Sequence, residues 1–120
     1  MPKLKNRKGY YYAPYIPDIP STPMNFEIAP KSTEIQATWD NAILYCTFLE
    51  VDGKRGWRLP TKEELNQIYE SNNDYEPIWY WSSTENDGNY AGSQYFIYGN
   101  QGYANKSDGG YVRAVRTIKE

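Results

Sequence analysis

The 120-residue sequence contains no histidine and only one cysteine, Cys46. Without histidine the chain lacks the commonest general base and the commonest metal ligand, and a single cysteine excludes an internal disulfide. Cys46 lies at an apolar position of a predicted helix, so we expect it to be a small buried hydrophobic residue. The paired acids Glu63 and Glu64 are typical of charges at a helix start. We therefore predict a protein that is not an enzyme and uses no cofactor.

The sequence also lacks long apolar runs. No stretch suits a membrane-spanning helix, and the basic N-terminal residues are not followed by the apolar run of a secretory signal. We therefore expect no membrane contact and synthesis in a host cytoplasm. The net charge of -2 argues against nucleic acid as the main partner. Residues 1–24 carry +3 and the remainder carries -5, which predicts that the basic N-terminal segment contacts an acidic surface.

Proline recurs at every third position from Pro14 to Pro23, a spacing that forbids a helix and favours polyproline-like extension. We predict that residues 1–24 are an extended Tyr/Pro-rich docking arm in front of a domain over residues 25–120. A disordered leader is the alternative. The residues expected to dock a partner are basic or apolar: Lys3, Lys5, Arg7, Lys8, Tyr10, Tyr11, Tyr12, Tyr15 and Ile16.

Two helices are predicted in the first half of the domain, after a short strand around Phe26 and Ile28. The first begins at Trp39, with Thr38 as its cap, and ends at Asp52-Gly53. Its many apolar residues predict burial on most sides. The second follows Pro60 and begins with a capping box between Thr61 and Glu64. Its apolar stripe is formed by Leu65, Ile68 and Tyr69.

Strands and turns are predicted from residue 75 onward. Strands are expected over 78–83, 94–98 and 111–118, with a further strand starting at Tyr103. A polar loop is expected over 85–92, and turns over 99–102 and 108–110. Trp79 and Trp81 alternate with Tyr80 and are expected to fill one face of the first long strand. The order of elements predicts an α+β fold in which two helices pack on a small twisted antiparallel sheet with long loops.

Four blocks stand in order along the chain: ATWDNA at 37–42, GWRLPTKEEL at 56–65, YWSSTE at 80–85 and YVRAVR at 111–116. This pattern resembles the C-terminal domain of collagen-like bacterial adhesins, a family with a C-type-lectin-like fold that also occurs in phage tail and virion proteins. The resemblance covers roughly residues 36–118. It implies a C-type-lectin-like domain whose long loops form the binding face.

The loops expected to bind a ligand lie within residues 84–110. Amide groups and exposed aromatic rings suit a sugar or a protein epitope, although the same residues also suit ordinary hairpins. The candidate ligand-binding residues are Asn86, Asp87, Asn89, Tyr90, Tyr95, Tyr98, Asn100, Tyr103 and Asn105.

The last predicted strand contains two arginines, and the chain also contains possible ligands of a calcium ion. Arg113 and Arg116 are expected to donate hydrogen bonds to carbonyls across the closing strands, and the alternative is a surface anion site. Calcium-dependent lectins hold their metal with a Glu-Pro-Asn loop, but this chain has Ile78 after Glu76-Pro77. Glu85, Asn86 and Asp87 supply oxygen atoms without the rest of a coordination shell, so we predict no metal site.

The favoured functional hypothesis is a bacteriophage virion component, either a capsid decoration or a tail protein, located in the virion. Residues 1–24 would dock to phage structural proteins, and many copies would give weak contacts avidity for a host-surface glycan or protein. A bacterial surface adhesin is the first alternative. A formylglycine-generating-like enzyme is the second, but that chemistry needs a reactive cysteine pair, which a single buried Cys46 does not supply.

Overall fold

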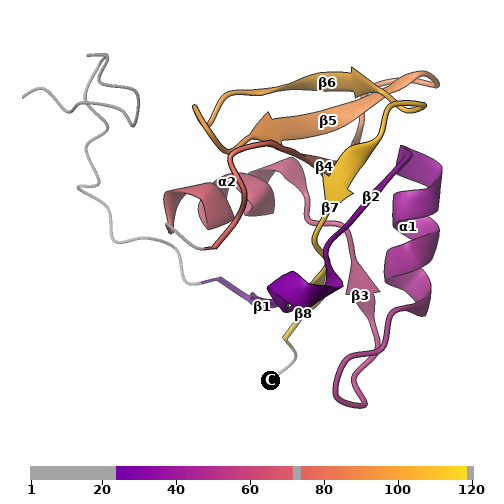
Figure 1. Cartoon of the computed structure of the whole chain (residues 1–120), viewed down its shortest axis with the longest axis vertical. Helices are drawn as coiled ribbons and strands as arrows, with labels where there is room; N and C mark the ends of the chain where they lie inside the picture. The colour runs from indigo at the N-terminus through magenta and orange to yellow at the C-terminus, as the bar shows by residue number, and fades with distance from the viewer. Residues whose placement is uncertain (1–23, 72–73, 119–120) are drawn as a thin grey trace, which may run out of the picture.

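Two helices and two sheets make up the regular structure of residues 24–71 and 74–118, which are the residues described by the computed structural model (Figure 1). Neither helix in these ranges is long and apolar enough to cross a membrane. The elements are β1 (Phe26–Ile28), the 3-10 turn η1 (Lys31–Thr33), β2 (Ile35–Ala37), α1 (Trp39–Phe48), β3 (Trp57–Arg58), α2 (Lys62–Glu70), β4 (Trp79–Glu85), β5 (Tyr90–Tyr95), β6 (Gln101–Asn105), β7 (Gly110–Val112) and β8 (Val115–Thr117).

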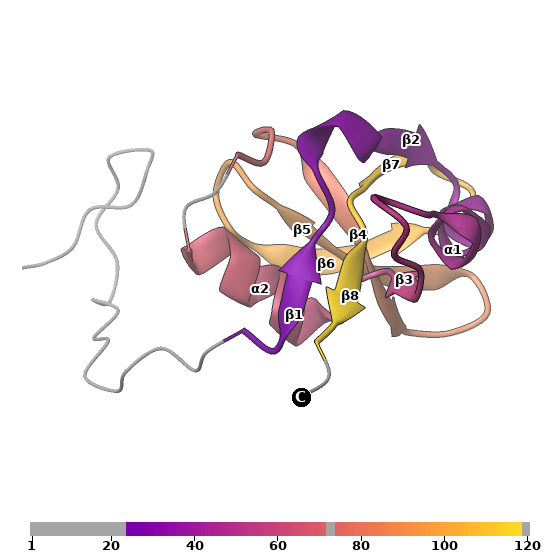
Figure 2. The same cartoon turned by 90° about the horizontal axis from the view of Figure 1, so that it is seen from below.

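The strands form a three-stranded sheet, β1-β8-β3, and a five-stranded sheet, β2-β7-β4-β5-β6. The α+β class is confirmed, but the single antiparallel sheet is wrong, since there are two sheets and β4 pairs with β7 in parallel. The predicted strand over 111–118 is interrupted at Arg113-Ala114, where Ala29 N–H donates to the Ala114 carbonyl (2.9 Å). At this point the chain leaves one sheet and enters the other. Figure 2 shows β1 and β8 side by side, with α2 to one side and α1 to the other.

Aromatic residues that alternate along β4 connect two hydrophobic clusters. Trp81 is fully buried in the first cluster, where Trp79 packs against it, and Tyr80 points into the second cluster with Leu65 and Ile68 of α2. The prediction that Trp79 and Trp81 share one face is confirmed. The side-chain period of two in a strand therefore lets β4 contribute to both cores.

The prediction that the first helix is buried on most sides is wrong. Only Trp39, Ala42 and Cys46 of α1 are buried, whereas the Phe48 side chain is 71% exposed and Leu44 is also exposed. Both figures place α1 at the margin of the domain, and its three buried residues belong to the first cluster. An apolar residue on a helix does not by itself show which face packs.

The ends of α1 also differ from the prediction. Thr38 occupies the N-cap position, but its side chain makes no capping hydrogen bond. The helix ends at Phe48 rather than at Asp52-Gly53. Both of those residues have positive φ (52° and 78°) and form the turn of a small hairpin closed by Val51 and Lys54. A left-handed pair of this kind suits a tight hairpin turn as well as a helix end.

The second helix, α2, is confirmed with its capping box. Thr61 Oγ1 accepts from Glu64 N–H (3.1 Å), and Glu64 Oε1 accepts from Thr61 N–H (2.9 Å). Leu65 and Ile68 are buried as predicted, because they lie on the helix face that packs on β4 and β5. The capping box predicted where α2 begins, and the packing of the helix agrees with its predicted apolar stripe.

The hairpin boundaries in the second half were displaced in the prediction. β5 runs over Tyr90–Tyr95, so the expected strand at 94–98 and the polar loop at 85–92 are both misplaced. The turn spans 96–100, and Gln101 and Gly102 belong to β6. Phe96 leaves the ladder because its ring is buried in the second cluster, where it stacks on Tyr75 (centroids 4.7 Å apart). Gly110, expected in a turn, begins β7.

Candidate functional site

The hairpin tip at residues 86–89 is held by its own hydrogen bonds. Asp87 Oδ1 accepts from the N–H groups of Asn89 (2.7 Å) and Tyr90 (3.0 Å), which is the usual role of aspartate in a turn. Glu85 forms an ion pair with Lys106. Within the described ranges no group of three or more acidic, cysteine or histidine side chains is placed to hold a metal ion. The tip geometry is therefore explained by turn formation.

A groove of about 390 Å³ lies beside β5 and β6, and we call it the aromatic groove. It contains five of the predicted ligand residues, and Asn86, Asp87, Asn89 and Tyr98 are not among its lining. The lining residues are Trp79, Tyr90, Ser93, Tyr95, Asn100, Gly102, Tyr103, Ala104, Asn105 and Asp108.

The strand register divides the predicted ligand residues between two faces of the sheet. Tyr95 lies opposite Trp79, and residues directly opposite each other share a face. Tyr90 pairs with Asn105, and Tyr103 pairs with Gly92, on the other face. The Tyr103 ring there meets Lys62 of α2 (5.9 Å from nitrogen to centroid). The aromatic groove thus offers Trp79 and Tyr95, rather than the full predicted set, as side chains on one face.

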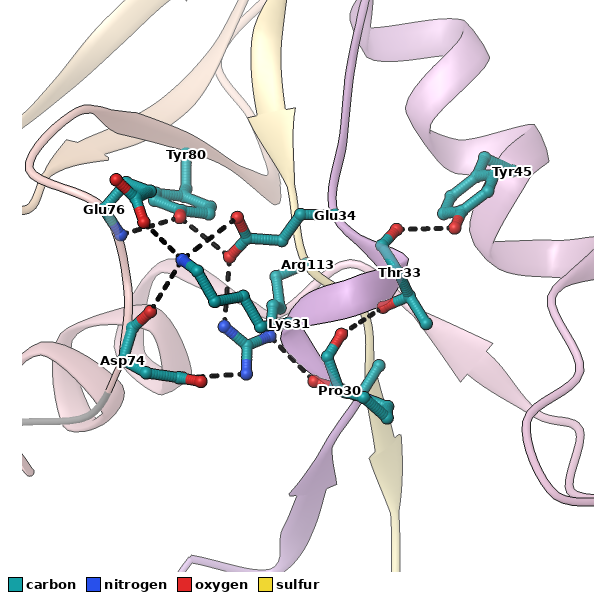
Figure 3. A network of polar contacts seen from close by, with 10 residues as sticks. Pro30, Lys31, Thr33, Glu34, Tyr45, Asp74, Glu76, Tyr80 and Arg113 are labelled. Carbon is teal, nitrogen blue, oxygen red and sulfur yellow. Dashed lines mark hydrogen bonds and ion pairs between the residues drawn. The ribbon is translucent and has the colours of Figure 1, made fainter.

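Arg113 occupies the centre of a polar network that joins both sheets (Figure 3). Its Nε donates to the Ala29 carbonyl (2.7 Å), Nη1 to Glu34 (3.0 Å) and Nη2 to Asp74 (2.9 Å). The guanidinium also stacks over the Tyr75 ring (4.7 Å). The predicted carbonyl bond is confirmed, and burial of the Arg113 side chain to 5% exposure rules out a surface anion site at this residue.

The same network includes Tyr80, whose hydroxyl donates to Glu34 (2.8 Å) and accepts from Glu76 N–H (3.0 Å). Burial raises the pKa of Tyr80 well above its usual range. Lys31 Nζ donates to the Asp74 carbonyl (3.0 Å) and pairs with the Glu76 carboxylate. These groups bind one another, which identifies the network as a structural link rather than a site for a ligand.

A second groove, of about 700 Å³, includes Arg116, for which a surface anion site was the alternative prediction; the other lining residues were not predicted, and we call it the basic groove. The described residues contain eight lysines and arginines, and four of these line this groove: Lys54, Arg55, Arg58 and Arg116. Glu27 is the only acidic residue among the lining. The groove lies where the hairpin after α1 meets the three-stranded sheet, and the remaining lining residues are Gly56, Thr117 and Ile118.

The four cations differ in how far their donors are already used. Arg58 donates both terminal nitrogens to Glu64 (2.7 and 2.9 Å) and also bonds to Thr117 and the Leu59 carbonyl. Arg58 is therefore a structural residue that ties β3 to α2 and β8. Arg55 has one contact, with Glu50 (3.1 Å), and its side chain is 66% exposed. Exposed pairs of this kind contribute little and exchange readily for other anions.

Arg116 and Lys54 share the carboxylate of Glu27. Arg116 Nη1 lies 2.8 Å from one Glu27 oxygen, and Lys54 Nζ lies 3.3 Å from the other. Arg116 is oriented by a bond from its Nε to the Arg55 carbonyl (2.6 Å), which confirms the second predicted carbonyl contact. Gly56, the residue after Arg55, has a φ of +93°, a conformation that favours glycine at this point of the chain. Burial opposes ionisation of Glu27, but the bonds from Arg116 and Lys54 outweigh it and lower its pKa.

Cys46 has the environment expected of a structural thiol. It is buried in the first cluster, and this burial raises its pKa to about 12. A thiol with such a pKa is not a nucleophile near neutrality. The docking residues Lys3, Lys5, Arg7, Lys8, Tyr10, Tyr11, Tyr12, Tyr15 and Ile16 lie outside the described residues.

Comparison with known families gives a match to one family model over most of the chain. The model of the Lcl C-terminal domain matches residues 20–116, a span that includes all four sequence blocks, the whole aromatic groove and all of the basic groove except Thr117 and Ile118. This match confirms the family predicted from those blocks. A search of curated proteins found no match.

Proposed function

This chain belongs to the Lcl C-terminal domain family, which indicates a surface adhesin-like domain, and we propose that it is a non-enzymatic attachment domain that binds anionic polysaccharide through the basic groove. The observation that carries this proposal is the collection of half of the described basic side chains around one groove, although the body outside the N-terminal arm is acidic. Such local concentration on an acidic body attracts an anion to one place rather than to the whole surface.

A charged sugar polymer suits the molecule better than nucleic acid does. Of the four cations that line the basic groove, only Lys54, Arg55 and Arg116 have donors that a ligand can reach, which is few for a groove that binds closely spaced phosphates. The aromatic groove on the other sheet adds Trp79 and Tyr95, ring faces that cover the apolar face of a sugar. We expect weak binding at each groove, and several copies of the domain together raise the overall affinity through avidity.

The finer assignments made from the sequence are retained as part of this proposal. We propose that the α+β body is a C-type-lectin-like domain, in which the basic groove is the main contact surface and the part of the 84–110 region that lines the aromatic groove is a second one. Attachment to a phage capsid or tail through residues 1–24 stays a prediction, because residues 1–23 lie outside the described part of the chain. Incorporation of a chain lacking residues 2–24 into phage particles tests it, and full occupancy of the truncated chain would refute it.

The experiment compares binding to immobilised polygalacturonate, dextran sulfate and uncharged dextran at low and high salt. We expect binding to both charged polymers, loss of that binding in high salt and no binding to dextran. Arg55→Gln should weaken binding roughly fivefold, the size of one partly exposed charge interaction. Lys62→Gln removes the same charge on α2, outside the basic groove, and serves as the control. Equal effects of the two substitutions would show that general charge, rather than the groove, determines binding.

A further inference from the structure

The basic groove already contains an anion from the protein itself. Glu27 projects from β1 into the groove, and its two carboxylate oxygens lie against Arg116 and Lys54. Glu27 and Arg116 are direct cross-strand partners in the β1–β8 ladder, so strand pairing places the two side chains next to each other. The site that an external carboxylate or sulfate would use is therefore the site that Glu27 occupies.

We propose that Glu27 is an internal competitor that sets the affinity and selectivity of the basic groove for anionic sugars. The inference rests on the proposed function, because it describes how the same groove admits its ligand. A ligand oxyanion that displaces the Glu27 carboxylate takes over the nitrogens of Lys54 and Arg116. A ligand group without charge gains nothing by that exchange.

The surroundings of Glu27 allow such an exchange. The Arg116 side chain keeps its orientation without Glu27, because its Nε is bound to the Arg55 carbonyl. Lys54 is half exposed, at the closing pair of the small hairpin after α1, so its amine can follow either anion. Arg55 stands beside both and offers a further donor to a ligand that extends along the groove. Displacement of Glu27 therefore leaves three cations in place around the incoming group.

The competitor role makes a prediction opposite to that of a simple contact residue. Glu27→Gln should tighten binding of polygalacturonate about fivefold, since it removes one partly exposed repulsion and frees two cations. Glu27→Asp keeps the charge on a shorter side chain and should bind close to wild type. A residue needed only for folding would instead weaken binding when substituted. Urea denaturation of both variants checks that the sheet is intact.

The control is Glu63→Gln, which removes the same charge from an exposed position on α2 outside the groove. Affinity for polygalacturonate and for dextran sulfate is measured for wild type and the three variants. Tighter binding by Glu27→Gln than by Glu63→Gln supports the proposal, and a gain with only one polymer identifies the preferred oxyanion. If wild type binds and Glu27→Gln is no tighter than the control, the competitor role is wrong while the proposed function stands. If no variant binds either polymer, both are wrong.

Discussion

The substitution Arg113→Met tests what joins the two sheets. Arg113 lies at the bend between β7 and β8, and its three contacts reach the segment after β1, the Glu34 carboxylate and the Asp74 carboxylate. Methionine has a similar reach and no charge, so the cavity left behind is small. The main consequence is electrostatic, because the Glu34 side chain is only 8% exposed and loses its buried cation.

The expected cost follows from that burial. Removing one partner of a buried ion pair destabilises a protein by about 3–5 kcal/mol, a large part of a typical total of about 5–15 kcal/mol. Asp74, in contrast, is 59% exposed. Its contact with Arg113 is largely screened by water, so Asp74→Asn should cost no more than about 1 kcal/mol.

Urea denaturation at neutral pH measures both variants, with the m value as a check that the denatured state is unchanged. The double variant Arg113→Met/Glu34→Gln should recover part of the loss, since it also removes the buried carboxylate that has lost its closest cation and keeps only Lys31, 3.9 Å away, as an ion-pair partner in the described part of the chain. A cost for Arg113→Met below about 1 kcal/mol, or equal costs for Arg113→Met and Asp74→Asn, would refute the reasoning.

Further predictions concern packing, capping and the thiol. A Cβ on Gly110 would lie 2.4 Å from Trp79, so Gly110→Ala should cost about 1–3 kcal/mol in denaturation, whereas Gly102→Ala, with nothing within 4 Å, should be near neutral. Thr61→Ala should cost about 1 kcal/mol by loss of the capping box, measured in the same way. Cys46, with its pKa raised to about 12 by burial, should resist a thiol reagent at mildly alkaline pH and react once guanidinium unfolds the chain; rapid reaction of the native protein would contradict its burial.

The sequence predicted those features that depend on local chemistry. The capping box of α2 needs only Thr61 and Glu64, three residues apart, and it appears as expected. The alternation of Trp79, Tyr80 and Trp81 likewise follows from the period of a strand. The capping box and the aromatic alternation each depend only on residues within one short segment. Tertiary packing therefore did not alter either prediction.

The errors lie where tertiary packing decides the outcome. Phe48 is apolar yet exposed, because only one face of α1 meets the core. Phe96 fits a strand pattern, but its ring enters the second cluster and ends β5 early. The spacing of apolar residues in a segment does not show which other helices or strands that segment packs against.

Of the basic groove, only Arg116 was named from the sequence, as an alternative anion site, because the lining residues are distant in the sequence. Glu27 and Arg116 are 89 positions apart, and Arg116 and Arg55 are 61 apart. Only the pairing of β1 and β3 with β8 brings them together. The short run Lys54-Arg55-Gly56 was the one local signal, with a glycine whose φ of +93° is a conformation that other residues rarely adopt.

The location of the ligand tests the central claim most directly. Amide chemical shifts of the labelled protein, recorded while short oligogalacturonates are added, show which residues contact the sugar. The account predicts the largest shifts at Gly56, Thr117 and Ile118, which line the basic groove, and smaller shifts at the aromatic groove. The turn at residues 86–89 should not respond. Shifts confined to that turn, or no shifts at concentrations that saturate binding to the polymer, would contradict the account.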